Sequence, residues 1–231
     1  MTKYVLANWK SHKTMPEAEK WMENFCHFYR PAPQVKVIIA PSFIYIARLW
    51  EMLQGQAIAN LSLAVQDLSP FPLGAYTGAV AAEMVRDLVE YAIIGHSERR
   101  HYFHETNQEI ANKVYEAVTA NIKPILCVDQ PYAYSQILAL DNGANLDDLI
   151  IGYGPVESIG IDIPQSPERT KRVLKELQTI APGKPILYGG SINKDNAATY
   201  MRLDGVSGLM VGSKSLNPEE FADICNTVSQ S

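Results

Sequence analysis

The ten residues YAIIGHSERR, numbered 91–100, contain the unit from which the fold can be inferred. Four apolar residues, 91–94, come first without polar alternation, which is typical of a parallel strand buried on both faces. A glycine and a polar turn follow them, and a helical pattern then runs over residues 105–120. The stretch therefore predicts a buried strand, a polar turn at its carboxyl end and a helix beyond.

Seven more apolar runs of this kind lie along the chain, at residues 4–7, 35–40, 58–65, 124–128, 149–153, 185–188 and 206–211. Helical patterns separate the runs, over residues 15–29, 43–54, 80–89, 105–120, 132–140, 167–180, 194–201 and 218–228. This alternation predicts a parallel sheet, and eight units favour a closed (β/α)8 barrel over an open doubly wound sheet. No linker or low-complexity tract interrupts the pattern, so residues 1–231 are expected to form one α/β domain.

Composition limits the classes of function. The 231 residues are 47% hydrophobic and carry a net charge of −5, from 20 basic and 25 acidic side chains. This balance supports one well-buried core and gives no general attraction for nucleic acid or anionic membranes. No apolar run is long enough to span a bilayer, and the N-terminal residues are interpreted as a strand rather than a secretory signal. Cys26, Cys127 and Cys225 are odd in number and far apart, which favours a reducing, cytoplasmic compartment.

Polar residues and glycines directly follow several predicted strands, where the active residues of such barrels lie. Ten candidates follow five of the strands: Asn8 and Lys10, His96 and Glu98, Gly154, then Gly189, Gly190 and Ser191, and finally Gly212 and Ser213. If the barrel closes, these residues meet at one rim.

The two glycine-bearing turns after the last strands have two interpretations. Glycine lets the backbone approach an anion closely, and N–H groups at a helix start point toward it, so these turns could bind a phosphate. They could instead be ordinary turns at strand ends. The phosphate interpretation is favoured because the loops after strands seven and eight are the usual phosphate site of such barrels.

Three side chains at the rim could supply or tune charge. Lys10 could be a solvated surface lysine, or it could compensate a negatively charged oxygen. His96 could be structural, or a nearby helix start could hold it neutral and suited to donating a hydrogen bond to a carbonyl. Glu98 could be a catalytic acid, but an ion pair with Lys10 is the favoured interpretation.

No metal site is expected from the residues. His101 and His104 are three positions apart, a spacing that could suggest a metal site. No cysteine or carboxylate cluster of ligand type accompanies them, so solvated side chains are the favoured interpretation.

Residues 66–78 are long for a loop between a strand and a helix. They include four apolar residues that a monomer would expose: Leu68, Phe71, Leu73 and Tyr76. Long ordered loops are usually functional, and exposed apolar loops suggest a partner surface. A homodimer through this loop is the economical expectation.

Five motifs, in order along the whole chain, resemble the triosephosphate isomerase family. They are NWK at 8–10, GAYTG at 74–78, IGHSERR at 94–100, YGGS at 188–191 and VGS at 211–213, with support from PILCV at 124–128. Each motif is weak alone, but together, at the expected strand ends, they are specific. The chain length, Glu157 and the pair Ile163-Pro164 are more similar to the family's compact archaeal form.

The resemblance implies an enzyme that interconverts glyceraldehyde 3-phosphate and dihydroxyacetone phosphate in glycolysis, without metal or organic cofactor. Asn8 and Lys10 would bind substrate, and Glu98 would support Lys10. His96 would polarise the carbonyl as a neutral electrophile, which is the family's mechanism and not a result of the pattern. A lid over residues 155–164 would exclude water, and loop 66–78 would reach into a neighbouring subunit's site. The phosphate would be held by Gly160, Ser191, Gly212 and Ser213.

The chain departs from the family's pattern at four places. The family's catalytic base is a glutamate just before the lid proline, whereas this chain has Gly154, which has no group to move a proton. The lid tip reads Gly-Ile-Asp at 160–162 in place of Gly-Thr-Gly. Ser213 stands in place of a glycine, and Asp129-Gln130 stands in place of Gly-Glu.

Three functions are therefore open. The first is an isomerase whose activity is impaired by Gly154. The second is a non-catalytic binder of a triose phosphate or another anion, because binding and proton abstraction use different residues. The third keeps an enzyme, with Glu157 as a surrogate base or with a related, longer phosphorylated sugar as substrate.

Overall fold

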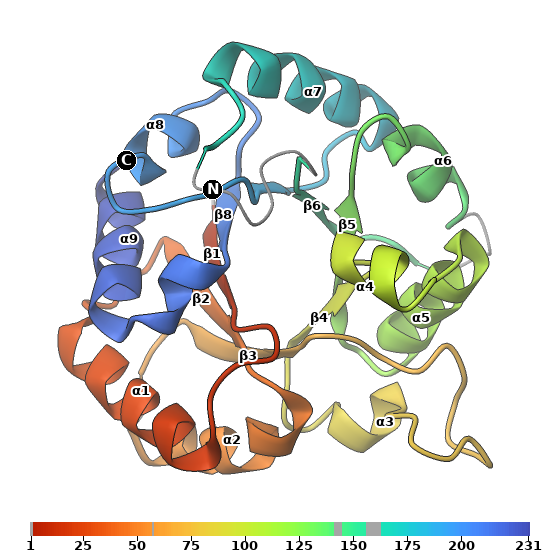
Figure 1. The fold of residues 1–231 in the computed structure, drawn as a ribbon, viewed down its shortest axis with the longest axis horizontal. Helices are drawn as coiled ribbons and strands as arrows, with labels where there is room; N and C mark the ends of the chain where they lie inside the picture. The colour runs from red at the N-terminus through yellow and green to blue at the C-terminus, as the bar shows by residue number, and fades with distance from the viewer. Residues whose placement is uncertain (1, 57, 141–144, 156–162) are drawn as a thin grey trace.

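The computed structural model describes residues 2–56, 58–140, 145–155 and 163–231, and its strands form a closed parallel barrel (Figure 1). Each strand pairs with its neighbours in chain order, and β8 closes the ring against β1. The strands are β1 (Lys3–Asn8), β2 (Val35–Ala40), β3 (Leu61–Val65), β4 (Tyr91–Ile94), β5 (Lys123–Val128), β6 (Ile150–Tyr153), β7 (Ile186–Tyr188) and β8 (Gly208–Val211). The expected (β/α)8 barrel is confirmed.

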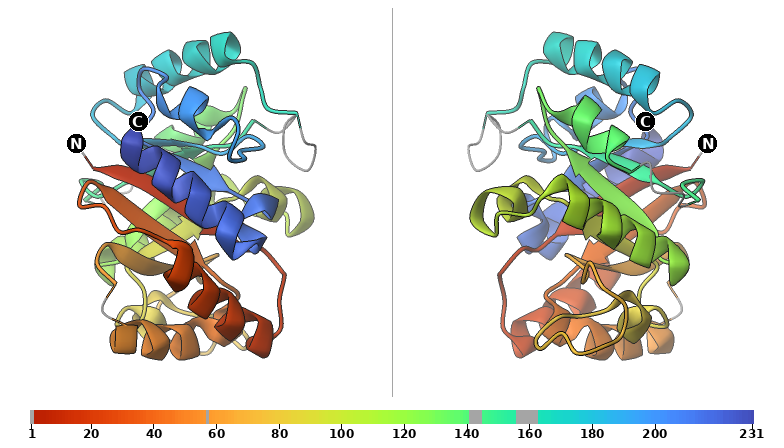
Figure 2. Two further views of the ribbon diagram at one scale, coloured as in Figure 1. Left: turned by 90° about the vertical axis from the view of Figure 1, so that its left-hand side faces the viewer. Right: turned by 90° about the vertical axis from the view of Figure 1, so that its right-hand side faces the viewer.

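Helices surround the barrel on its outside, as the face view and the two side views show (Figures 1 and 2). They are α1 (Met15–Phe28), α2 (Ile46–Gln56), α3 (Ala82–Val85), α4 (Ser97–Tyr102), α5 (Asn107–Thr119), α6 (Ala133–Leu138), α7 (Pro167–Ile180), α8 (Ala197–Met201) and α9 (Pro218–Gln230). Two short 3₁₀ turns, η1 (Phe43–Tyr45) and η3 (Ser213–Leu216), accompany them. In the described parts of the chain, none of these helices has the length and apolar character to cross a membrane.

The strands are buried on both faces because two separate cores flank them. Inside the barrel, alternate strand residues such as Leu6, Ile93 and Ile125 form one fully buried cluster. The residues between them, such as Val5 and Ala92, face outward and pack with the helices in a larger cluster. This arrangement explains why the sequence of each strand is a continuous apolar run rather than an alternation of apolar and polar residues.

Several predicted elements are shorter than their apolar patterns indicated. The strand expected at 58–65 begins at Leu61, because Asn60 before it is in the left-handed region with a φ of 63°. The helix expected at 80–89 covers only Ala82–Val85. The helix expected at 194–201 begins at Ala197, since the Asn193 side chain accepts hydrogen bonds from the next N–H groups and forms a turn there instead.

The long loop after β3 runs outward past α3 (Figure 1). Phe71, Leu73 and Tyr76 are exposed there, by 43%, 61% and 44%, and the rings of Phe71 and Tyr76 stack with centroids 4.5 Å apart. The expectation that Leu68 would be exposed is wrong, because this side chain is buried in the core between the barrel and its helices. The apolar surface of the loop therefore lies at its tip and not at its base.

Candidate active site at the barrel rim

A cavity of about 250 Å³ lies where the strands end and their following turns begin. Eight of the predicted rim residues line it: Asn8, Lys10, His96, Gly154, Gly189, Ser191, Gly212 and Ser213. Of the other candidates, Glu98 and Gly190 do not line this cavity, and Gly160 lies outside the described residues. The rim predicted from strand ends is therefore a real concave site.

Lys10 has a strained backbone that its neighbours hold in place. Its φ is 52°, in the left-handed region that costs a non-glycine residue about 1–3 kcal/mol. The Asn8 side-chain oxygen accepts a hydrogen bond from the Lys10 N–H at 3.0 Å. The Lys10 carbonyl accepts hydrogen bonds from Gln66 at 2.9 Å and from Ser42 at 3.3 Å. The direction in which Lys10 leaves β1 is therefore fixed by three other side chains.

The Lys10 ammonium is paired with Glu98. Its Nζ lies 2.6 Å from the Glu98 carboxylate, and both side chains are about one-third exposed. Glu98 comes from the first turn of α4, so the pair joins the end of β1 to the turn after β4. The ion-pair interpretation of Glu98 is confirmed, and it places one positive charge beside the cavity.

His96 is the N-cap of α4, and its ring nitrogen Nδ1 accepts a hydrogen bond from the Glu98 N–H at 3.2 Å. Because Nδ1 is an acceptor, the proton of the neutral ring is on Nε2. Burial lowers the pKa of His96, and the charges of Lys10 and Arg99 lower it further against the opposing effect of Glu98. A neutral His96 can thus donate a hydrogen bond from Nε2 to an oxygen bound in the cavity.

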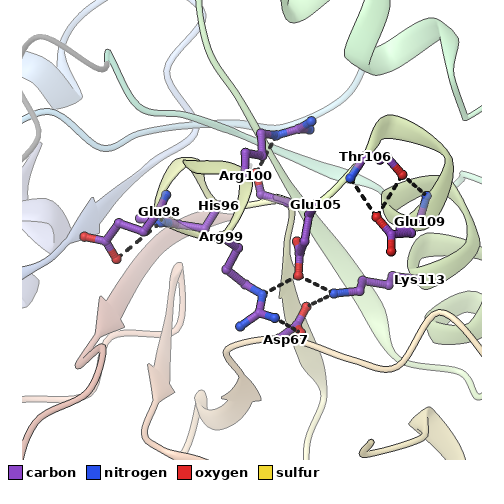
Figure 3. A network of polar contacts seen from close by, with 10 residues as sticks. Asp67, His96, Glu98, Arg99, Arg100, Glu105, Thr106, Glu109 and Lys113 are labelled. Carbon is purple, nitrogen blue, oxygen red and sulfur yellow. Dashed lines mark hydrogen bonds and ion pairs between the residues drawn. The ribbon is translucent and has the colours of Figure 1, made fainter. Parts of the chain in front are cut away.

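A buried charge network anchors α4 behind the histidine (Figure 3). Arg99 contacts Asp67 at 2.7 Å and Glu105 at 2.5 Å. Lys113 of α5 contacts the same two carboxylates, at 2.7 and 2.5 Å, and both Lys113 and Glu105 are nearly inaccessible to solvent. Burial raises the pKa of Asp67 against the lowering effect of these cations. The network connects the end of β3, α4 and α5, and so fixes the helix start that holds His96.

The turn after β7 is constrained by packing. A Cβ on Gly190 would lie 2.3 Å from the Tyr188 hydroxyl, and one on Gly189 would lie 2.5 Å from a methionine methyl, that of Met210. Gly190 is therefore required by close packing below the rim, as in the ordinary-turn interpretation. Gly189 still borders the cavity.

The turn after β8 is more open. A Cβ on Gly212 would meet only the Lys10 Cε, at 3.8 Å. Gly212 is followed directly by η3, whose first residues Ser213 and Lys214 also line the cavity. Glycine here leaves backbone surface bare beside a positive side chain, which suits an anion.

Gly154 is the first residue after β6, and its N–H donates to the Val128 carbonyl at 3.3 Å. It lines the cavity, and the following Pro155 is buried. The expected lid residues 156–162, which include Glu157, Gly160 and Asp162, lie outside the described residues. The end of β6 therefore reaches the cavity without presenting a side chain to it.

Several lining residues were not among the predicted candidates. They are His12, Arg100, Asp129 and Asn193. The position directly after a strand is a signal that could have singled out Asp129, which follows β5. His12 and Asn193 lie farther into their loops, where strand patterns give no guidance.

The structure also shows the surroundings of the two histidines considered for a metal site and of the Cys127 thiol. His101 and His104 are both exposed, and within the described residues no group of three metal-ligating side chains comes together. Cys127 is buried as expected, and burial raises the pKa of its thiol to about 12. The thiol therefore keeps its proton at neutral pH.

Fold and site together define a class: a (β/α)8 barrel whose rim carries an ion-paired lysine and a neutral histidine beside open glycine turns. A family profile described as triosephosphate isomerase matches residues 3–228. The triosephosphate isomerase of Aquifex aeolicus is 33% identical over 246 residues, which cover 97% of this chain and 98% of that protein. That of Thermodesulfovibrio yellowstonii is 35% identical, covering 96% of this chain and 98% of its own length. That of Coxiella burnetii is 32% identical, covering 98% and 97%.

The chain belongs to the triosephosphate isomerase family. Its enzyme class is therefore that of the aldose–ketose isomerases. The match extends over nearly all of this chain and of each of these relatives, so the assignment concerns the entire barrel.

Proposed function

We propose that this protein interconverts glyceraldehyde 3-phosphate and dihydroxyacetone phosphate, at a rate limited by the glycine at position 154. Membership in the family supports a triose phosphate as substrate and a place in glycolysis. One observation carries the proposal: Lys10 and His96 border a single cavity, and the end of β6 that reaches this cavity bears no side chain.

Two groups would polarise the substrate carbonyl. Lys10, held by Glu98, places positive charge beside the oxygen that becomes negative. The neutral His96 ring donates a hydrogen bond to the same oxygen from Nε2, because its Nδ1 already accepts from the α4 backbone. Groups fixed before the substrate arrives stabilise an enediolate without reorganising during the reaction.

The substrate phosphate would bind at the turns after β7 and β8. Gly189, Ser191, Gly212 and Ser213 border the cavity there, and Lys214 adds a positive charge. The open backbone at Gly212 supports close approach by phosphate oxygens. Gly160, on the expected lid, would complete this site.

Position 154 is where the family's glutamate would take the proton from carbon. General acid–base catalysis by a positioned side chain typically supplies about 10²–10⁴ in rate, and glycine supplies none of it. Substrate binding uses other residues, so affinity can persist while turnover is slow.

Calorimetry and kinetics test the two halves of the proposal. A phosphorylated mimic of the enediolate is expected to bind, and failure to bind would refute the site. Gly154→Glu is expected to raise kcat, whereas Gly154→Gln, which is similar in size but has no basic group, is not. Binding of the mimic with no turnover even by Gly154→Glu would instead support a non-catalytic binder.

We also propose that the chain acts as one domain, in the cytoplasm, and as a homodimer joined through loop 66–78. The exposed Phe71, Leu73 and Tyr76 at the loop tip support the dimer, since a monomer would leave them in water. The odd number and wide spacing of the cysteines support the reducing compartment.

A further inference from the structure

Asp129 directly follows β5, the strand that pairs with the one ending before Gly154. Val128 and Tyr153 are the last register partners of β5 and β6, and the Gly154 N–H donates to the Val128 carbonyl. Asp129 and Gly154, the residues that follow these two strand ends, therefore lie side by side at the rim. Both line the cavity that Lys10 and His96 also line.

Asp129 is the one carboxylate among the described residues that line this cavity. The neighbouring Cys127 thiol keeps its proton because burial raises its pKa to about 12. The Nδ1 of His96 already accepts a hydrogen bond from the α4 backbone. His12, which also lines the cavity, is exposed and follows β1, which is three strands from β6 around the barrel.

The Asp129 carboxylate is held by one oxygen. Gln136, a buried residue of α6, donates from Nε2 to Oδ1 of Asp129 at 2.6 Å, and the Asp129 N–H donates to the Gln136 Oε1 at 3.1 Å. Within the described chain, Oδ2 of Asp129 makes no hydrogen bond or ion pair. The carboxylate is thus oriented through Oδ1, and Oδ2 remains able to accept a proton.

A purely structural role as the counter-ion of Arg100 does not fit the contacts. Arg100 also lines the cavity, but it donates to the Gly95 carbonyl at 2.9 Å and to Asn107 at 2.7 Å. No ion pair joins Arg100 to Asp129 in the part of the chain that the structure describes. Burial lowers the pKa of Arg100, and the nearby Asp129 charge acts against this effect, so the two groups attract each other without a direct contact.

We propose that Asp129 is the general base of this chain, a carboxylate presented by β5 in place of one on β6. This inference rests on the function proposed above. Asp129 takes the proton from the carbon beside the carbonyl, and the C–H electron pair becomes the C=C bond of an enediolate. The carbonyl π pair moves to its oxygen, beside Lys10 and His96. Asp129 then returns the proton to the other carbon, while the hydroxyl proton passes between the two oxygens.

The test is exchange of substrate carbon-bound hydrogen with deuterated solvent, measured beside kcat and KM. In Asp129→Asn the amide oxygen can still accept the Gln136 hydrogen bond, so the variant removes the base and retains this contact. We expect the exchange rate and kcat to fall about a hundredfold or more, with KM little changed. Asp223→Asn, which also removes one carboxylate but from an exposed position on α9, is expected to exchange like the parent.

The combination Gly154→Glu with Asp129→Asn separates catalysis from structure. If Asp129 is a base, this double variant retains the activity of Gly154→Glu alone, because the restored glutamate makes Asp129 redundant. An inactive double variant beside an active Gly154→Glu would mean that Asp129 supports the fold, and it would overturn the proposal.

Other results also decide the question. Exchange in Asp129→Asn at the parent rate, a change in KM alone, or no exchange by the parent would each overturn the role of Asp129. The proposed isomerase function survives those results whenever Gly154→Glu is active. If Gly154→Glu is inactive as well, both proposals fail together.

Discussion

At the scale of single residues, the site depends on a histidine that stays neutral at the start of a short helix. The His96 side chain is 17% exposed, and its Nδ1 accepts a hydrogen bond from the Glu98 N–H, which a protonated ring could not do. Protonation would therefore break the cap of α4 and place a second positive charge near Lys10. Both effects act in the same direction as burial, which lowers the pKa of His96.

The neutral state of His96 predicts how stability depends on pH. The unfolded chain takes up a proton at this residue as pH falls through about 6.5, while the folded chain resists it. The stabilisation is thus fully present above about pH 6.5 and is lost on acidification, by at most about 1.4 kcal/mol per pH unit. The free energy of unfolding can be measured with denaturant for the parent and for His96→Asn, which retains an N-cap acceptor. The advantage of the parent over His96→Asn in this free energy should become smaller below pH 6.5. A difference that widens on acidification would mean that His96 is charged in the folded state.

Residue type and position could predict Lys10, His96 and Glu98 because each lies within four residues of the end of a strand whose pattern is clear. The same reasoning failed for Gly190 and Leu68. Gly190 lies in the right turn, but the Tyr188 hydroxyl occupies the space beside it. Leu68 is in a loop, yet it packs into the core outside the barrel. Such packing involves residues that are distant in sequence, so it cannot be predicted from a local sequence pattern.

At the scale of elements, Glu90 connects strands at the end of the barrel opposite the rim. It precedes β4 and contacts Lys36 of β2 at 2.6 Å, Ser62 of β3 at 2.6 Å and Lys123 of β5 at 3.2 Å. Burial alone would raise the pKa of Glu90, but these partners outweigh it and lower the pKa to about 2. One carboxylate thus helps to fix the order and spacing of four neighbouring strands.

The contribution of Glu90 to the stability of the fold should depend on pH. Its pKa is lower in the folded chain than in the unfolded one, so its stabilisation is complete above about pH 4.5 and disappears as pH falls toward 2. The parent should therefore be more stable than Glu90→Gln near neutral pH, with the gap closing in acid. Thermal unfolding of the two proteins across this range measures the gap, and a gap that does not depend on pH would contradict the role of this carboxylate.

The eight strands could be predicted from sequence because burial on both faces leaves an apolar run at every one. Their ends and the shorter helices could not. The Asn193 side chain competes with the helix for backbone N–H groups and delays the start of α8. Asn60 adopts a left-handed turn that delays β3. The positions where these elements begin depend on side-chain hydrogen bonds and backbone angles, which cannot be inferred from hydrophobic periodicity.

At the scale of the whole molecule, the apolar tip of loop 66–78 should determine the oligomeric state. Leu73→Asp places a charge on an exposed leucine of the tip, and it is expected to convert a dimer to a monomer in light scattering. Leu138→Asp makes the same change on an exposed leucine of α6 and should leave the dimer intact. A monomeric parent, or a Leu73→Asp protein that stays dimeric, would contradict the proposed interface.

The barrel as a whole makes the central claim testable, because Lys10, His96 and Gly154 belong to neither core. Strands far apart in sequence bring Lys10, His96 and Gly154 to one cavity, and only the last of them lacks a reactive group. Binding and polarisation should therefore be intact while proton transfer is weak.

The decisive measurement is kcat/KM for isomerisation of glyceraldehyde 3-phosphate by the parent, Gly154→Glu and Gly154→Gln. The account predicts that Gly154→Glu exceeds the parent by about 10²–10⁴-fold, while Gly154→Gln gains nothing. Equal values for the parent and Gly154→Glu, whether high or low, would contradict the claim that this barrel is an isomerase limited by the glycine at position 154.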